Sequence, residues 1–259
     1  MKEYSKEQIR AKLQEIEQEE QVRIVYACES GSRAWGFPSK DSDYDVRFIY
    51  VRKPEWYLSI FTRRDVIDRP IDSLLDINGW DLKKALNLFR KSNPPLLEWL
   101  QSPIVYSEEG ATAAWIRSIS PLTFSPKACL YHYLHMAKGN FRDYLQGEQV
   151  NIKKYFYVLR PVLACLWIER YNTLPPVAFR ELLDRMLDEG TELKAVIETL
   201  LARKIAGDEL DYEPQIPLIN QFLNEQITAL ERAATDMTAR AADQDEQLDE
   251  LFRAALKEI

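Results

Sequence analysis

Two aspartates separated by a single residue, Asp43 and Asp45, are the side chains of this sequence whose type and spacing indicate chemistry most directly. They open a segment, residues 43–51, with the alternation typical of a strand, and strand side chains two positions apart point to the same face. Convergent carboxylates suit a hard divalent cation, because magnesium binds through one or two carboxylates together with substrate phosphates. The partner of this pair is therefore expected to be a phosphate.

Gly31 and Ser32 lie upstream, directly after the apolar segment 22–28, and provide a seat for that phosphate. Glycine lets the backbone approach a ligand closely, the N–H groups of a following helical turn would point at an anion, and the serine hydroxyl adds a donor. A phosphate seat and a carboxylate pair joined by a short loop are the elements of nucleotidyl transfer. In that reaction catalysis is mostly positioning and charge neutralisation.

Two other interpretations of the acidic run compete with the metal site. A calcium loop starting at Asp41 needs glycine at its sixth position and glutamate at its twelfth, where this chain has Val46 and Arg52. Solvated surface acids are the other interpretation. The Gly-Ser pair upstream favours the catalytic metal site over both.

A site for two metals needs a third carboxylate from a neighbouring strand, and Asp76 is the chosen candidate. It lies at the C-terminal end of a predicted strand, residues 71–77, that can pair beside the first two acids. Asp72, at the other end of the same segment, competes with it, and Asp81 is more simply a charge at a helix N-terminus. In this hypothesis Asp76 would accept the proton of the incoming hydroxyl or hold the metal that activates it.

The Gly31-Ser32 turn followed by Asp43-Tyr44-Asp45 resembles the signature of the DNA-polymerase-β-like nucleotidyltransferase superfamily. A narrower resemblance, over roughly residues 22–171, is to predicted bacterial and phage nucleotidyltransferases of RNA-ligase and RNA-repair loci. Four segments carry it: 76–86, 92–94, 98–100 and 102–106.

The resemblance implies an NTP substrate and a magnesium or manganese cofactor held by Asp43, Asp45 and Asp76. Asp76 matches the third acid of the family by position. An RNA acceptor is the option that the narrower resemblance favours, although related enzymes modify proteins or small molecules.

A predicted helix, residues 152–171, carries the remaining candidates for nucleotide binding. Lys153, Tyr157 and Arg160 are spaced to share one face, which on spacing alone is typical of a solvated surface. Nucleotidyltransferases of this architecture commonly grip the triphosphate with a lysine of the helical domain. The resemblance therefore implies Lys153 or Lys154 in that role, with Tyr157 as a weaker candidate.

Other aromatic and histidine side chains give weaker signals. Trp35 lies in the expected phosphate loop and could pack beneath it or stack on a base, whereas Trp80 is expected to be a core residue. His132 and His135 lack a third ligand nearby in sequence and make a poor zinc site.

Composition limits the class of protein. The net charge of −7 argues against a protein whose main role is coating nucleic acid, but it allows an RNA substrate held by a local patch. The three cysteines lie far apart in apolar surroundings and are expected to be reduced. No apolar run reaches membrane-spanning length and the first residues lack a signal-peptide core, so we expect a cytoplasmic protein with no membrane partner.

The order of predicted elements indicates an α+β fold. A helix is expected over 6–19, strands over 22–28, 43–51, 65–68, 71–77 and 104–106, and a helix from Trp80 to about Lys91 that Asn78-Gly79 would cap. After residue 106 we predict only helices, the first beginning at Glu108. The predicted domains are a nucleotidyltransferase domain with a small mixed sheet, residues 1–106, and a C-terminal helical bundle, residues 107–259, with the nucleotide cleft between them.

Two hypotheses of function follow. The first is a metal-dependent nucleotidyltransferase that transfers NMP from an NTP to a hydroxyl acceptor and releases pyrophosphate. The alternative is a non-catalytic nucleotide- and metal-binding protein that regulates or scaffolds RNA processing. Base preference, acceptor and oligomeric state cannot be read from the sequence.

Overall fold

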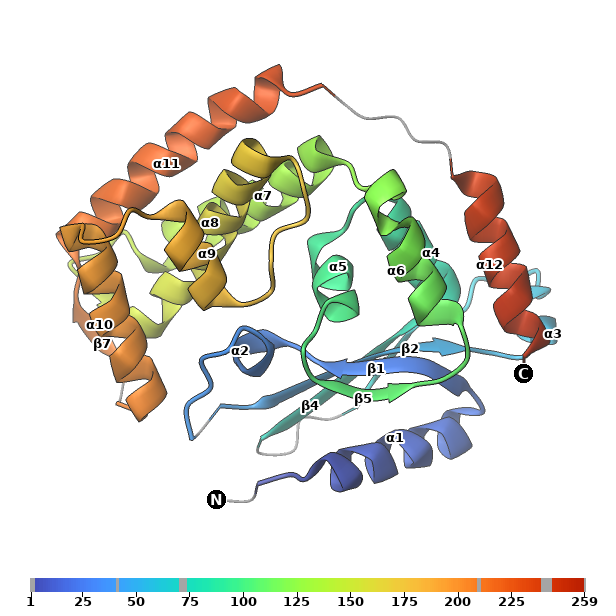
Figure 1. Ribbon diagram of the computed structural model, residues 1–259. Coiled ribbons are helices and arrows are strands. Elements are labelled where there is room, and N and C mark those ends of the chain that lie inside the picture. The colour runs from blue at the N-terminus through green and yellow to red at the C-terminus, as the bar shows by residue number, and fades with distance from the viewer. Residues whose placement is uncertain (1–2, 41, 70–73, 209–210, 239–243, 259) are drawn as a thin grey trace. The chain divides into compact units, whose positions relative to one another are not determined.

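The computed structural model describes residues 3–40, 42–69, 74–208, 211–238 and 244–258 (Figure 1). The chain forms two compact units. The first consists of Met1–Ala34, Ser42–Thr123 and Ala242–Ile259, and the second of Trp35–Asp41 and Phe124–Ala241. This division differs from the predicted domains 1–106 and 107–259, because helices α6 (Thr112–Thr123) and α12 (Asp245–Lys257) belong to the first unit.

A mixed five-stranded sheet organises the first unit. Its strands follow the order β3-β4-β2-β1-β5, and they are β1 (Arg23–Glu29), β2 (Tyr44–Val51), β3 (Val66–Asp68), β4 (Leu75–Asp81) and β5 (Val105–Glu108). The β2–β4 pair is parallel and the other pairs are antiparallel. With the surrounding helices this sheet makes the fold α+β, as predicted.

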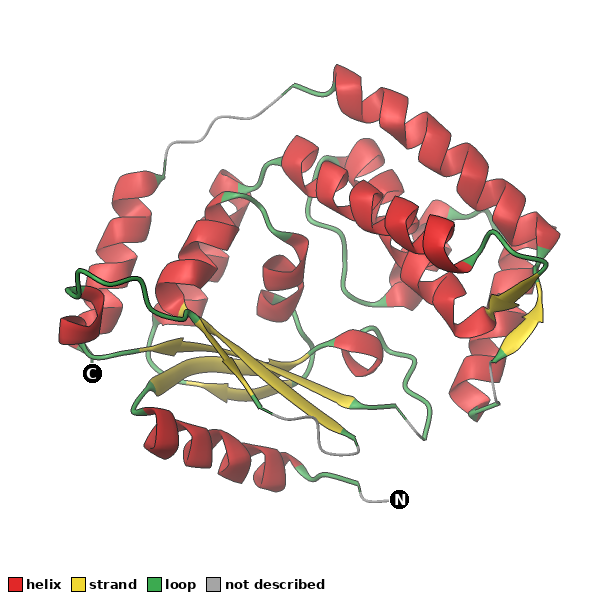
Figure 2. Cartoon of the chain, turned by 180° about the vertical axis from the view of Figure 1, so that it is seen from behind, coloured by secondary structure: helices red, strands yellow, loops and turns green. Residues whose placement is uncertain are grey.

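Helix α1 (Lys6–Glu20) covers one face of this sheet (Figure 2). A capping box begins this helix, since the Ser5 hydroxyl accepts from the Gln8 N–H and the Gln8 side chain accepts from the Ser5 N–H. The apolar stripe of α1 packs with the side chains of β2 and β4 that point the same way: Ile9, Leu13, Ile16, Tyr44, Val46, Phe48, Tyr50, Leu75 and Ile77. The intervening residues of β2 and β4 therefore point to the opposite face.

The remaining helices of the first unit include two short ones, α2 (Gly31–Ala34) and α3 (Pro54–Tyr57), and the longer α4 (Leu82–Arg90) and α5 (Pro94–Leu100). Trp80 of β4 stacks on Trp99 of α5 with ring centroids 3.9 Å apart. Trp80 thus has a packing role, but it is only half-buried and does not belong to the buried core expected for it.

The predicted helix start at Trp80 is wrong. Strand β4 continues through Trp80 to Asp81, and α4 begins at Leu82 with the Asp81 carboxylate accepting from the Lys83 N–H at 2.8 Å. Asn78-Gly79 is typical of a turn, but here Gly79 is a strand residue against the Phe48 ring, where a Cβ would lie 2.1 Å from a ring carbon. Packing across the sheet thus determines the conformation of this dipeptide.

The second unit is mainly helical. It contains α7 (Pro126–Tyr144), a 3₁₀ turn (Ile152–Lys154), α8 (Tyr155–Tyr171), α9 (Phe179–Met186), α10 (Glu192–Ala206) and α11 (Pro217–Asp236). The prediction that strands end at residue 106 is wrong, because β5 runs to Glu108 and a two-stranded antiparallel sheet pairs β6 (Gln149–Asn151) with β7 (Tyr212–Pro214). Three-residue strands are too short to give an alternating signal. None of the helices in the described ranges combines the length and apolarity needed to cross a bilayer.

Candidate functional site

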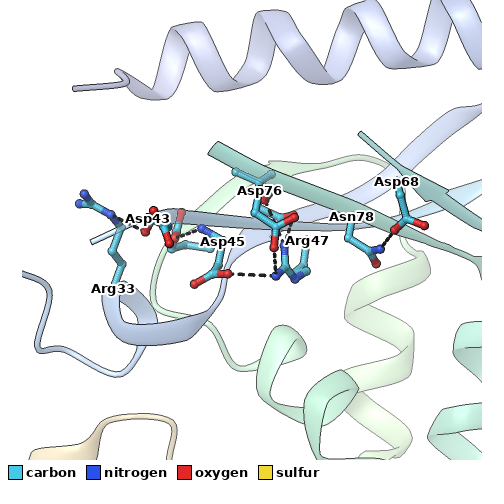
Figure 3. A network of polar contacts seen from close by, with 9 residues as sticks. Arg33, Asp43, Asp45, Arg47, Asp68, Asp76 and Asn78 are labelled. Carbon is cyan, nitrogen blue, oxygen red and sulfur yellow. Dashed lines mark hydrogen bonds and ion pairs between the residues drawn. The ribbon is translucent and has the colours of Figure 1, made fainter. Parts of the chain in front are cut away.

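Asp45 and Asp76 lie side by side across the parallel strands β2 and β4, where they are register partners. Both point away from α1, on the face of the sheet shown in Figure 3. Each carboxylate is partly accessible, with 29% and 31% of the side chain exposed. The parallel pairing thus joins two acids that are far apart in the sequence.

Arg47 bridges these two carboxylates (Figure 3). One terminal nitrogen of its guanidinium donates to Asp45 Oδ1 at 3.0 Å and to Asp76 Oδ2 at 2.7 Å, while the other donates to the Asp76 carbonyl at 3.0 Å. The sequence analysis gave Arg47 no role. Its position two residues after Asp45 on one strand was the available signal, because that spacing puts both side chains on one face.

The electrostatic environment of Asp45 combines burial with charge. Burial raises the pKa of the Asp45 carboxyl above its usual value, and the Arg47 guanidinium opposes that rise. The neighbouring carboxylates of Asp76 and Asp43 raise the pKa further. A positive charge close to Asp45 therefore stabilises its ionised form.

Asp43 precedes β2 and is exposed. Its backbone carbonyl accepts from Arg33 Nε at 3.1 Å, and the Arg33 guanidinium lies 3.7 Å from the centroid of the Tyr44 ring. Within the described ranges, no group of three or more His, Cys, Asp or Glu side chains is spaced to hold a metal. Convergence of Asp43 with Asp45 and Asp76 on one ion stays a prediction, and the competing candidate Asp72 falls outside those ranges.

The Gly31-Ser32 turn lies directly against Asp45. Gly31 has φ +58°, and a Cβ there would come within 2.0 Å of Asp45 Oδ2. The Ser30 N–H donates to the Asp45 carbonyl at 2.8 Å, and Gly31 and Ser32 begin α2. Only glycine allows both this left-handed backbone and the close approach to the carboxylate.

Glu29 is a supporting residue that the sequence interpretation missed. It ends β1, is fully buried, and accepts from the Asp45 N–H at 2.7 Å through Oε1, while Oε2 accepts from the Tyr106 hydroxyl. Burial raises the pKa of Glu29 to about 7. The available signal was a glutamate that directly continues an apolar strand. Such a position is expected to be buried, and a buried carboxylate almost always has hydrogen-bond partners.

The predicted nucleotide-binding residues Lys153, Lys154 and Tyr157 all belong to the second unit. Lys153 is exposed at the 3₁₀ turn. Lys154 Nζ lies 4.8 Å from the centroid of the Tyr157 ring and 4.5 Å from that of Tyr144. These two cation–π contacts place Lys154 between half-exposed aromatic rings, a setting that holds its ammonium near the surface.

Trp35 and Arg160 extend this aromatic group within the second unit. The Trp35 ring lies 5.9 Å from that of Tyr157, and the buried Arg160 guanidinium lies 4.8 Å from the Trp35 centroid. Arg160 is therefore not on a solvated helix face, contrary to the interpretation from spacing alone. Trp35 is packed against Phe37 as well, and stacking of its half-buried ring on a base stays a prediction.

The donor set of the first unit fits a hard divalent cation. Asp45 and Asp76 supply carboxylate oxygens from adjacent strands, and the site already gathers a positive charge in the Arg47 guanidinium. Oxygen ligands of this kind suit magnesium or manganese. A divalent cation held by these oxygens would supply the positive charge that a phosphate group needs.

Comparison with known proteins relates this site to a family. The model of RlaP, described as the RNA repair pathway DNA polymerase beta family, matches residues 5–254. The chain is 54% identical over 254 residues to the protein YcgL of Bacillus subtilis (strain 168), covering 98% of this chain and 97% of YcgL. Among solved structures it matches a nucleotidyltransferase-like protein from Exiguobacterium sibiricum 255-15 with 10% identity and a TM-score of 0.33, over 97% of this chain and 80% of that one. With nearly its whole length matched, the chain belongs to the RNA repair pathway DNA polymerase beta family.

Proposed function

We propose that this protein is a magnesium- or manganese-dependent nucleotidyltransferase that transfers NMP from an NTP to a hydroxyl acceptor. Membership in a polymerase-β family indicates nucleotidyl transfer as the reaction class. The observation that carries the proposal is the pairing of Asp45 with Asp76 across β2 and β4, next to the Gly31 turn. This arrangement places carboxylates beside a backbone bend that a phosphate could approach.

The reaction would be an in-line displacement at the α-phosphorus. The acceptor oxygen forms a bond to phosphorus, the bond from phosphorus to the β-bridging oxygen breaks, and pyrophosphate leaves with the electron pair. The hydroxyl proton passes to a carboxylate, for which Asp76 is our choice, or to water. The divalent cation would be held by Asp43, Asp45 and Asp76, and it would supply charge neutralisation for the phosphates.

The remaining residues position these groups. Glu29 holds the Asp45 backbone and Gly31-Ser32 would seat the phosphates, while the resemblance assigns the nucleotide to Lys153, Lys154 and Tyr157. Arg47 donates to both Asp45 and Asp76 and would hold the two carboxylates side by side before the substrate binds. An RNA end is our proposed acceptor, on the strength of the family description.

The test is incubation with each α-³²P-labelled NTP, magnesium or manganese, and total RNA, followed by measurement of pyrophosphate and labelled RNA. We expect pyrophosphate release by the unmodified protein and its loss in Asp45→Asn. Asp68→Asn is the matched control, because Asp68 lies on β3 of the same sheet and its partners are Arg64 and Asn78 rather than Asp45 or Asp76. Equal turnover in Asp45→Asn and the unmodified protein would contradict the proposed mechanism.

One observation favours a second candidate, a nucleotide-binding protein that performs no transfer. Arg47 supplies counter-charge to Asp45 and Asp76 from within the chain, so the carboxylate pair is satisfied by the protein itself. Saturable binding of an NTP, with no pyrophosphate released with any NTP or metal, would support this candidate over the enzyme.

A further inference from the structure

The first unit contains a basic pocket at the opposite ends of β2 and β4 from the carboxylate pair. This cavity of about 550 Å³ lies between α3, the loop 58–64 and α4. Its lining carries four cationic side chains, Arg63, Lys83, Lys84 and Lys91, against two carboxylates, Asp65 and Asp81. In a chain of net charge −7, a local excess of positive charge indicates an anionic ligand.

The carboxylates of the pocket are already engaged, whereas most of its cations are not. Asp65 pairs with Lys84 at 3.0 Å, and the buried Asp81 accepts from the Tyr57 hydroxyl at 2.8 Å and from the Lys83 N–H. In the described part of the chain, no ion pair joins the ammonium of Lys83 or Lys91. These two exposed lysines are therefore available to a ligand.

The spacing of the two lysines suits a polymer rather than a single phosphate. Lys83 and Lys91 are separated by eight residues along α4 and its C-cap, with Asn87 between them on the same side. At the rise of an α-helix that separation is about 12 Å, the length of three to four stacked nucleotides of one strand. Two phosphates of one strand, three to four nucleotides apart, could each contact one of the ammonium groups.

Aromatic and apolar side chains at the rim complete the chemistry. Phe61 is 74% exposed, Ile60 is 92% exposed, and the Arg63 guanidinium lies 5.9 Å from the centroid of the Trp56 ring. Proteins that bind single-stranded nucleic acid combine exposed aromatic rings with basic side chains, because the bases stack on the rings while the phosphates contact the cations. A membrane surface would need only a protruding apolar loop. The hollow lined by lysines therefore favours a bound strand over a membrane.

We propose that the pocket of Phe61, Lys83 and Lys91 binds single-stranded nucleic acid through its phosphodiester backbone and bases. On β4 the pocket residue Asp81 is five residues from Asp76, or roughly 17 Å, which about five stacked nucleotides would span. If the proposed transferase acts on a polynucleotide, this pocket would hold the strand behind its reacting end. Binding itself does not require the catalytic function.

The test is fluorescence anisotropy of labelled single-stranded oligonucleotides of about twelve residues, RNA and DNA of one sequence, at about 50 and 200 mM salt. We compare Lys83→Gln/Lys91→Gln and Phe61→Ala with Lys6→Gln/Lys257→Gln. This control removes the same charge from exposed lysines at the start of α1 and the end of α12. The ratio of RNA to DNA affinity tells which polynucleotide the pocket prefers.

We expect the double lysine variant to lose at least about tenfold in affinity and to lower the salt slope by about 1.4, since each phosphate of a single strand contributes about 0.7. Phe61→Ala should lose about tenfold through stacking. Asp45→Asn should bind normally, so failure of the proposed catalysis would leave this result unaffected. Equal losses in the control, or binding only to phosphatidylserine vesicles, would overturn the proposal.

Discussion

The two ends of the β2–β4 pair have opposite chemistry. At one end Asp45 and Asp76 are partly buried and joined by Arg47, and at the other Lys83 and Lys91 stand exposed beside Phe61. Parallel pairing produces this polarity, because it brings the N-terminal ends of both strands to one edge of the sheet and their C-terminal ends to the other. The carboxylate end is held in place by the fold, while the basic end is open to solvent and sensitive to salt.

The largest expected effect is at the carboxylate end. Asp76→Asn keeps the shape of the side chain but removes a charge from the pair, and we expect turnover to fall by about 10²- to 10³-fold with little change in folding. Pyrophosphate release measures turnover, and circular dichroism checks the fold. If Asp76→Asn turns over as fast as Asp68→Asn, the third acid has been assigned to the wrong residue.

Gly31→Ala tests whether activity at the carboxylate end depends on the close approach of the Gly31 backbone to Asp45. The added Cβ would meet Asp45 Oδ2, so we expect turnover to fall by about tenfold to 100-fold through displacement of that carboxylate. Gly36→Ala is the matched control: its φ is also positive, +88°, but a Cβ there meets nothing within 4 Å.

Both glycine variants should lose about 1 kcal/mol or more of unfolding free energy from the left-handed backbone, as measured by urea denaturation. Only Gly31→Ala should lose the activity as well. A similar loss of turnover in both variants would show that backbone strain, and not displacement of Asp45, is responsible.

Arg47→Gln tests the internal counter-charge. Without the guanidinium, Asp45 and Asp76 repel each other, and we expect the free energy of unfolding to fall by about 1–3 kcal/mol in the absence of divalent cations. Magnesium or manganese should then raise the melting temperature of Arg47→Gln more than that of the unmodified protein, because the cation replaces the lost charge.

The control for Arg47→Gln is Arg64→Gln, which removes an exposed arginine that pairs with Asp68 on the same sheet. Its stability should change little, and the metal response should match that of the unmodified protein. If the metal raises the melting temperatures of Arg47→Gln and Arg64→Gln equally, a cation does not bind in place of the Arg47 guanidinium.

Much of the carboxylate end could be predicted from the sequence because its signals are local. The two-residue spacing of Asp43 and Asp45 and the upstream glycine require only a strand and a turn, and both are present. The local signals of Arg47 and Glu29 did not identify their partners Asp76 and Tyr106, because those contacts come from strand pairing and burial between distant segments. Long-range contacts of this kind are absent from local periodicity.

The errors in the fold have the same origin. Asn78-Gly79 has turn chemistry, but the Phe48 ring on the neighbouring strand fills the space that a side chain at Gly79 would occupy. The strands β6 and β7 are too short for alternation to be visible, and they pair segments more than fifty residues apart in sequence. The helices with strong stripes, such as α1, were predicted to within about two residues, the accuracy expected of element ends.

At the basic end, Asp81 provides the smallest expected effect. Its carboxylate caps α4 and accepts from the Tyr57 hydroxyl, so Asp81→Ala should lower the free energy of unfolding by about 1–2 kcal/mol. Asp81→Asn keeps one acceptor oxygen, which can still cap the Lys83 N–H, and its amide can donate to the Tyr57 hydroxyl oxygen, so it should lose less. Chemical denaturation of the two variants at neutral pH measures the difference.

The pH dependence of Asp81→Asn follows from burial, which raises the pKa of the Asp81 carboxyl above its unfolded value. A carboxyl of this kind stabilises the fold most when protonated, so its contribution is lost as pH rises from the unfolded pKa through the raised one. The asparagine does not titrate, and the stability deficit of Asp81→Asn should therefore shrink as the pH rises above about 4, the pKa of an unfolded aspartate. A deficit that stays constant as the pH rises would show that ionisation of Asp81 does not destabilise the fold.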